Sequence, residues 1–188
     1  MTVPSDFHLP VFPFVVLTRP NIEDRFQQGQ PGLNNICELH ELKARHQRGQ
    51  RLFGLDLGSR TIGISVSDGG LLIATPFYTI RRTKFTADVA ELAKMAAREN
   101  IFALVIGMPW NMDGSEGRRA QSTRAFIRNL DGKLDLPVVL WDERLSSVTA
   151  EESMIAAGVS QAKRALHVDA VAAAIILQGA LDRLARQA

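Results

Sequence analysis

The chain has 188 residues, enough for one ordinary domain with a buried core and a short appendage. Its composition, 46% hydrophobic and 22% charged with a net charge of +2, is that of a soluble globular protein, and no apolar run approaches the roughly 20 residues that a membrane-spanning helix needs. The single cysteine, Cys37, excludes an internal disulfide and a cysteine-based zinc site, and we expect a protein of the reducing cytoplasm.

The first 50 residues differ in composition from the rest of the chain. Five prolines interrupt residues 1–31, and the segment 27–32 has the Gln/Gly/Pro composition of a linker. A short amphipathic helix is predicted within 36–46, where Leu39 and Leu42 are three residues apart. We therefore expect residues 1–50 to be an N-terminal extension, partly disordered over its first 35 residues, and residues 51–188 to form the functional domain.

Three strands are predicted directly after the extension. An apolar run over 52–57 is followed by a turn at 58–60 and by a β-branched, alternating segment at 61–67, a pattern that is typical of a hairpin. A second turn at 68–70 leads into a third strand over 71–80. Strands that follow each other through tight turns pair antiparallel, so this part of the sheet is expected to be a meander.

Helices and strands alternate in the remainder of the chain. We expect helices over 84–100, 119–130, 149–157 and 166–185, and strands over 103–108 and 138–141. The order β-β-β-α-β-α-β-α-α predicts an α/β fold with a mixed five-stranded sheet, antiparallel at its start and parallel later, with helices on both faces.

Acidic residues follow two of the predicted core strands. Asp56 ends the first strand, and Asp142 and Glu143 directly follow the strand at 138–141. Functional sites form at the carboxyl ends of parallel strands, although a lone carboxylate there is more often a turn cap or part of a surface ion pair. Successive strand residues point to opposite faces, so we expect Glu143 to face the site and Asp142 or Arg144 to orient it.

A third carboxylate, Asp169, lies near the start of the last predicted helix. Ala172 and Ile176 follow it at spacings of three and seven, which places Asp169 on the apolar face of that helix. Burying a carboxylate is costly unless it has a partner or a metal ion. Three carboxylates with no His or Cys beside them suit Mg²⁺ or Mn²⁺, and two such ions can promote phosphodiester hydrolysis. We expect Asp56, Glu143 and Asp169 to be catalytic residues and metal ligands.

Basic residues and one polar loop are candidates for nucleic-acid contacts. The loop at 107–115 follows a core strand and precedes an arginine-rich helix, and it could hold a phosphate or a base against Trp110, or simply be a turn. Basic clusters are also often solvated surface. Asp68 is expected to be structural, because the hairpin places it at the opposite end of the sheet from Asp56. The candidates for nucleic-acid binding are Arg60, Asn111, Arg118, Arg119 and Arg124.

Four motifs in this order resemble one known family. They are Gly54-Leu-Asp56-Leu-Gly58-Ser-Arg60-Thr-Ile-Gly63-Ile-Ser-Val-Ser-Asp68, Gly107-Met-Pro109-Trp-Asn111-Met-Asp113-Gly114-Ser, Asp142-Glu143-Arg144-Leu-Ser-Ser and Val168-Asp169-Ala-Val-Ala-Ala. Over residues 51–184 the chain resembles the YqgF family, also called RuvX. The family is described both as Holliday-junction-resolvase-like and as pre-16S rRNA nucleases, and is linked to maturation of the 5′ end of 16S rRNA.

The resemblance implies a ribonuclease-H-like fold, with Asp56, Glu143 and Asp169 as the acidic catalytic residues. It also implies a nuclease, with pre-16S rRNA as the expected partner and structured DNA as a further one. The cofactor expected from the carboxylates is Mg²⁺ or Mn²⁺, and the sequence leaves a monomer and a homodimer open.

Other functions remain open on the sequence alone. Actin-like kinases and ATPases also carry an Asp-x-Gly hairpin, but they need two such domains and this chain holds one. A Holliday junction resolvase acting on branched DNA is the closest alternative, because phosphate contacts do not distinguish RNA from DNA. A non-catalytic nucleic-acid-binding module with the same fold should have lost part of the acidic set, and here all three members are present.

Overall fold

The structure is a computed structural model, and it describes residues 35–145 and 168–186. The expected helix over 149–157 and most of the expected N-terminal extension lie outside these ranges. In the described part no helix is both long and apolar enough to cross a bilayer. The elements are α2 (Leu39–Arg45), β1 (Arg51–Leu57), β2 (Thr61–Ser67), β3 (Ala74–Arg81), α3 (Phe85–Arg98), β4 (Ile101–Met108), α4 (Arg118–Leu130), β5 (Val138–Asp142), the 3₁₀ turn η1 (Glu143–Leu145) and α7 (Val168–Arg186).

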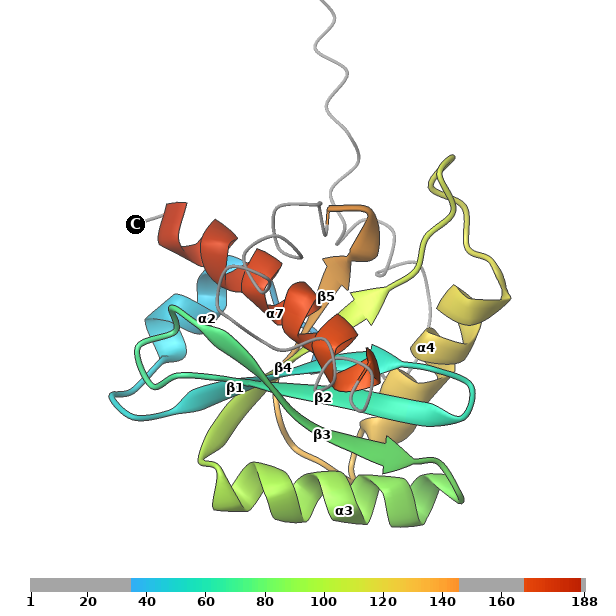
Figure 1. Cartoon of the computed structure of the whole chain (residues 1–188), viewed down its shortest axis with the longest axis horizontal. Coiled ribbons are helices and arrows are strands. Elements are labelled where there is room, and N and C mark those ends of the chain that lie inside the picture. Colours follow the sequence, from blue (N-terminus) through green and yellow to red (C-terminus); the bar gives the residue numbers. More distant parts are fainter. Residues whose placement is uncertain (1–34, 146–167, 187–188) are drawn as a thin grey trace, which may run out of the picture. The chain divides into compact units, whose positions relative to one another are not determined.

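The strands form one mixed sheet in the order β3-β2-β1-β4-β5. β1 pairs antiparallel with β2 and β2 with β3, whereas β4 pairs parallel with both β1 and β5. Figure 1 shows α7 crossing one face of the sheet and α3 lying on the other. The predicted ribonuclease-H-like architecture, a five-stranded mixed sheet with helices on both faces, is therefore confirmed.

The third strand begins later than predicted, at Ala74 rather than Leu71. The carboxylate of Asp68 accepts hydrogen bonds from the backbone N–H groups of Leu72 and Ile73, at 2.6 and 2.8 Å, and from that of Gly70 at 3.1 Å. These bonds close the segment before Ala74 into a loop, so its N–H groups are not available to a strand ladder. Asp68 is structural, as the sequence indicated.

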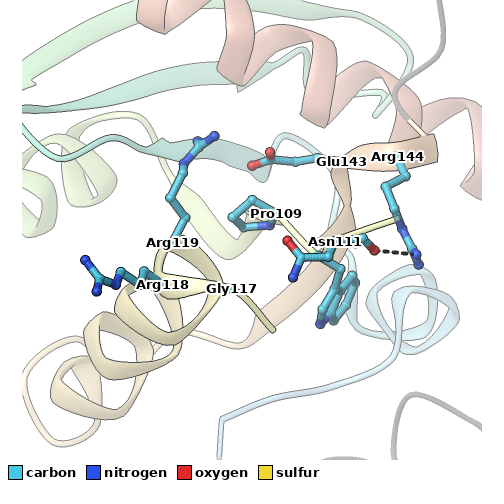
Figure 2. Close-up of a pocket in the computed structure, with 8 residues that line it drawn as sticks. Pro109, Asn111, Gly117, Arg118, Arg119, Glu143 and Arg144 are labelled. Carbon is cyan, nitrogen blue, oxygen red and sulfur yellow. Dashed lines mark hydrogen bonds between the residues drawn. The ribbon is translucent and has the colours of Figure 1, made fainter. Parts of the chain in front are cut away.

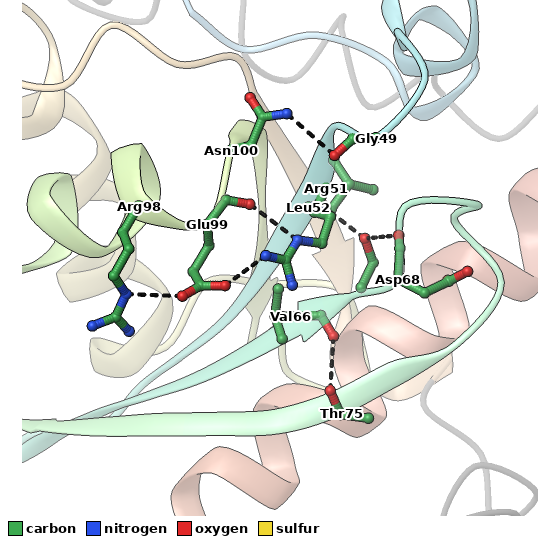
Figure 3. Close-up of polar contacts among 10 residues, drawn as sticks. Gly49, Arg51, Leu52, Val66, Asp68, Thr75, Arg98, Glu99 and Asn100 are labelled. Atoms are coloured by element: carbon green, nitrogen blue, oxygen red, sulfur yellow. Dashed lines mark hydrogen bonds and ion pairs between the residues drawn. The ribbon is translucent and has the colours of Figure 1, made fainter.

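Polar contacts fix the amino end of β1, the end opposite to Asp56 (Figure 3). Arg51 donates from Nε to the carbonyl oxygen of Glu99 at 3.0 Å and from Nη2 to its carboxylate at 2.6 Å. The backbone N–H of Leu52 donates to Ser67 Oγ at 2.9 Å, and Asn100 Nδ2 to the carbonyl oxygen of Gly49 at 3.2 Å. These contacts hold β1 against both of its neighbouring segments.

The described end of the expected extension packs on the sheet. Asn35 and Cys37 exchange backbone hydrogen bonds with Val138 at 2.7 and 3.0 Å, and the buried Leu39 and Leu42 of α2 join the core cluster that lies under α7. These residues belong to the same compact unit as the sheet. The predicted amphipathic helix is confirmed in position and in its docking on the core.

Helix α7 lies unusually close to β1 and β2. A Cβ atom on Gly54 would be 2.6 Å from the Cβ of Leu177, and one on Gly63 would be 1.9 Å from the carbonyl oxygen of Asp169. The buried Ser65 Oγ donates to the carbonyl oxygen of Ala173 at 2.8 Å. The backbone of α7 therefore rests on the strands, which only residues without a side chain at these two positions allow.

The substitution Gly63→Ala tests this close approach. The new methyl group would overlap helix backbone, which cannot move aside as a flexible side chain could, so we expect the free energy of unfolding to fall by at least about 3 kcal/mol. The matched control is Gly132→Ala, where a new Cβ would have no neighbouring atom within 4 Å. Only the positive φ of 71° would then destabilise the fold, by about 1 kcal/mol. Urea unfolding of both variants measures the difference; equal losses would contradict the contact.

Candidate active site

Asp56 is placed by the β1–β2 hairpin beside the start of α7. The hairpin pairs Asp56 with Gly63, and directly opposite residues of an antiparallel pair point to the same face. Gly63 is the position on which the backbone of Asp169 rests, so Asp56 and Asp169 are neighbours. Burial raises the pKa of Asp56, the charge of Arg119 lowers it, and the charge of Asp169 raises it further. The net effect is a carboxyl group that resists ionisation.

Glu143 reaches the same face from the other side of β1. It begins the turn η1 directly after β5, and a Cβ on Gly107 of β4 would lie 2.7 Å from its Oε1 atom. Burial raises the pKa of Glu143, the charge of Asp56 raises it further, and the charge of Arg119 lowers it. Asp56 interacts with both of the other carboxylates. It is therefore the middle member of a carboxylate row formed by Asp169, Asp56 and Glu143.

Asp142 forms an ion pair with Arg144. Arg144 Nη2 lies 2.6 Å from Asp142 Oδ2, and Nε donates to Oδ1 at 2.9 Å. Its Nη1 donates to the carbonyl oxygens of Asn111 and Met112, at 3.1 and 3.4 Å. Glu143, rather than Asp142, faces Asp56. Arg144 ties the turn that carries Glu143 to the loop between β4 and α4.

A pocket of about 470 Å³ opens beside Glu143 (Figure 2). The start of α4 forms one side of it, and the loop after β4 forms the other. Arg119 Nη2 also lies 4.0 Å from Asp56 Oδ1, and its side chain is 66% exposed. The pocket is lined by Pro109, Trp110, Asn111, Gly117, Arg118, Arg119, Glu143 and Arg144.

The candidates for nucleic-acid binding separate into three groups. Asn111, Arg118 and Arg119 line the pocket. Arg60 is exposed on the turn between β1 and β2, at the end of the sheet where Asp56 lies. The side chain of Arg124 is only 14% exposed and forms an ion pair with Glu116, so its charge is partly neutralised within α4 and the preceding loop.

Two features of the site escaped the sequence reasoning. Gly117, which directly precedes α4 and has no side chain, lines the pocket. Arg144 holds the loop by donating to the backbone carbonyl oxygen of Asn111. A glycine directly before an arginine-rich helix is a weak signal for the first feature. The second has no sequence signal, since every residue carries a carbonyl oxygen.

The donor chemistry of the row fits a hard divalent cation. Within residues 35–145 and 168–186, no three His, Cys, Asp or Glu side chains stand close enough together to form a ready-made metal group. The row nevertheless offers only carboxylate oxygens, and Asp56 interacts electrostatically with one partner on each side. Burial and the charge of a neighbouring carboxylate raise the pKa of both Asp56 and Glu143, and a bound cation would relieve both effects.

Comparison with known proteins identifies the family. The family model described as "RuvX: Holliday junction resolvase" matches residues 50–183. The chain belongs to the RuvX family. The resemblance seen in the sequence is thereby confirmed, and the prediction of a phosphodiester-hydrolysing enzyme is confirmed at the level of the family.

Individual RuvX relatives are similar over most of their length. A Rhizobium meliloti protein named "Putative pre-16S rRNA nuclease" is 57% identical over 150 residues, 80% of this chain and 91% of its own. A Rhodobacter capsulatus protein of the same name is 60% identical over 151 residues, 80% of this chain and 95% of its own. Among solved structures, the Thermus thermophilus RuvC in complex with Holliday junction substrate has a TM-score of 0.49 at 13% identity, covering 72% of this chain and 96% of that one.

The substitution Asp56→Asn should stabilise the metal-free protein at neutral pH. A raised folded-state pKa means that the fold favours the protonated carboxyl, so its stabilising contribution is present below the ordinary value of 3.8 and is lost as the pH rises through the raised value. An amide is neutral throughout. The gain in free energy of unfolding, measured by urea titration in EDTA, should therefore shrink as the pH is lowered towards 3.8.

The substitution Asp68→Asn is a control for which we expect the opposite change in the free energy of unfolding. Burial raises the pKa of Asp68, but its hydrogen bonds from the backbone N–H groups of Ile73, Leu72 and Gly70 outweigh burial and lower it. Its ionised form stabilises the fold above the ordinary pKa, so the amide should cost stability at neutral pH. A loss of stability in both variants at pH 7 would show that Asp56 is not under electrostatic strain.

Proposed function

We propose that this chain is a metal-dependent nuclease that hydrolyses phosphodiester bonds and processes the 5′ end of pre-16S rRNA. The observation that carries the proposal is the row of Asp169, Asp56 and Glu143 beside a pocket whose lining includes three arginines. The RuvX family supports phosphodiester chemistry. The names of the relatives, which share more than half of their residues with this chain, support an rRNA precursor as substrate.

Asp56, Glu143 and Asp169 would hold Mg²⁺ or Mn²⁺. When bound there, such an ion would supply an activated water and stabilise the leaving oxygen in phosphodiester hydrolysis. Asp56 lies between the other two carboxylates and would act with each of them in holding the ion. Glu143 and Asp169 come from turn η1 and helix α7, so the completed site depends on elements far apart in the sequence.

The arginines of the site would bind and orient the substrate. Arg119 lies beside Asp56 and is largely exposed, so its guanidinium can turn from the carboxylate to a phosphate oxygen when substrate arrives. Arg118 lies next to it on the same pocket wall, and Arg60 extends the basic surface to the β1–β2 turn. Asp142 and Arg144 would position Glu143 through their ion pair.

Branched DNA is the second candidate substrate, because the family is described as Holliday junction resolvases. Contacts to phosphates carry no information on the sugar, so the arginines named above fit either nucleic acid. Paired cuts in a junction would need a homodimer, whereas an rRNA processing enzyme can act as a monomer. A cytoplasmic location is part of the proposal.

The carboxylate variants Asp56→Asn, Glu143→Gln and Asp169→Asn test the proposal directly. Each should reduce the cleavage rate of pre-16S rRNA in Mn²⁺ by more than about 100-fold, because orienting partners of metal ligands already cost 10–100-fold when removed. Gel analysis of rRNA and branched DNA with and without EDTA measures this. The matched control, Asp135→Asn, changes an exposed carboxylate in the segment leading into β5 and should keep wild-type activity. Cleavage that survives EDTA would refute metal dependence.

Metal binding should also be visible without catalysis. A ligand that binds only the folded state stabilises it by about 2.7 kcal/mol at a concentration of 100 times its Kd. Mn²⁺ should therefore raise the melting temperature of the wild-type protein, and this increase should vanish in Asp56→Asn. An equal increase in both proteins would place the ion elsewhere.

A further inference from the structure

The pocket beside Glu143 has one strongly basic wall. It is formed by Gly117, the residue that precedes α4, and by Arg118 and Arg119 in the first turn of that helix. Gly117 has no side chain to cap the helix, and the first turn carries no acidic residue. The helix N–H groups and both guanidinium groups are therefore suited to a phosphate. Arg119 lies 4.0 Å from Asp56, which places this wall next to the carboxylate row.

The facing wall suits a nucleobase. Pro109 and Trp110 give it apolar surface, and the amide of Asn111 gives it polar groups. Asn111 Nδ2 donates to Ser115 Oγ at 2.9 Å with one of its two hydrogens. Its second N–H and its Oδ1 remain as a donor and an acceptor side by side, the pair with which an asparagine binds the edge of a base.

The loop that forms this wall is already ordered. Asn111 N donates to the carbonyl oxygen of Ser115 at 2.9 Å, and Gly114 N donates to that of Asn111 at 2.8 Å. Ser115 N and Oγ both donate to Asp113 Oδ1, at 2.9 and 2.6 Å. Arg144 also fixes the loop, because its Nη1 donates to the carbonyl oxygen of Asn111. A ligand would therefore bind without the entropic cost of ordering the wall.

Size and charge decide what the pocket can take. Its volume of about 470 Å³ lies in the usual range for one small ligand, which fits a single nucleotide but not a pair of stacked base pairs. The carboxylate of Glu143 repels phosphate from its own end, so the phosphate belongs on the α4 wall. A base inside a duplex is stacked and paired, and must leave the stack to enter a pocket.

We infer that this pocket is a subsite for one unpaired nucleotide adjacent to the phosphodiester that is cut, with its phosphate on Arg118 and the start of α4 and its base between Pro109 and Asn111. The inference rests on the proposed nuclease function and narrows its substrate to nucleic acid that is single-stranded at the cleavage point. Arg119 links the subsite to the carboxylate row, so occupation of the pocket sets the register of the strand for cleavage.

Binding in EDTA tests the subsite independently of catalysis. The full chain is titrated against three fluorescently labelled RNA probes of one sequence: a single strand, the same strand with one abasic position at its centre, and the duplex. The wild-type protein should bind the single strand about tenfold or more tightly than the duplex, since extruding a base costs a few kcal/mol. The affinity for the abasic probe should lie between the affinities for the single strand and for the duplex.

Two pocket variants and one control identify where this discrimination arises. Asn111→Leu should bring the affinity for the single strand down to that for the abasic probe. Arg118→Met, an exposed position that cannot disturb the core, should weaken single-strand binding several-fold with a smaller effect on the duplex. Asn129→Leu makes the same change as Asn111→Leu on the exposed face of α4 beyond the pocket and should bind like wild type.

A local signal comes from Trp110, one of only two tryptophans in the chain. In a Trp141→Phe background, a nucleoside 5′-monophosphate should change the fluorescence of Trp110, whereas inorganic phosphate or the nucleoside alone should change it less at equal concentration. Equal binding of paired and unpaired probes, discrimination that survives in both pocket variants, or no response of Trp110 would each overturn the subsite. If the wild-type protein distinguishes paired from unpaired probes but shows no metal-dependent cleavage, the proposed nuclease function is refuted and the pocket is a single-strand-binding site.

Discussion

The close approach of α7 to the sheet is the contact on which the rest of the site depends. The helix backbone rests on Gly54 and Gly63, and Ser65 Oγ donates a hydrogen bond to the helix carbonyl oxygen of Ala173. Interiors pack too tightly for such a contact to shift gradually, so the position of the helix along the strands is fixed. Asp169, at the first turn of α7, is carried by this contact to Asp56. A larger residue at either glycine would move the helix and separate the two carboxylates.

The carboxylate row works against the stability of the fold. Burial disfavours the ionised form of both Asp56 and Glu143, the charge of Asp169 adds to the cost at Asp56, and the charge of Asp56 adds to the cost at Glu143. The nearby guanidinium of Arg119 offsets this only in part. Proteins keep strain of this kind where function requires it, because a site that fits a cation or a transition state is poorly satisfied without one. The surrounding core, with the buried apolar residues of its strands, supplies the stability that the row removes.

Much of this arrangement could be predicted from the sequence, and the exceptions have a common cause. Alternating β-branched residues and glycine turns identified the hairpin, and the alternation of side chains along a strand selected Glu143 over Asp142. The close approach of the Asp169 backbone to Gly63, by contrast, depends on how a distant helix crosses the sheet, which no local pattern encodes. The sequence predicts a nucleic-acid contact at Arg124 because its ion-pair partner Glu116 lies in the loop before α4, eight residues away, where no helical spacing links the two. The start of β3 was placed too early because the hydrogen bonds of Asp68 override strand propensity.

Arg144 makes two parts of the site move as one. It joins the turn that carries Glu143 to the loop that carries Asn111, through Asp142 on one side and two backbone carbonyl oxygens on the other. A ligand that immobilises the loop would therefore narrow the positions open to Glu143, and a cation at the proposed site would steady the loop in return. Thermodynamic linkage requires that the two effects be equal, so cation and nucleotide should strengthen each other's binding by the same factor. Under the proposed function, the cation would then bind more tightly with a nucleic-acid strand in place than without it.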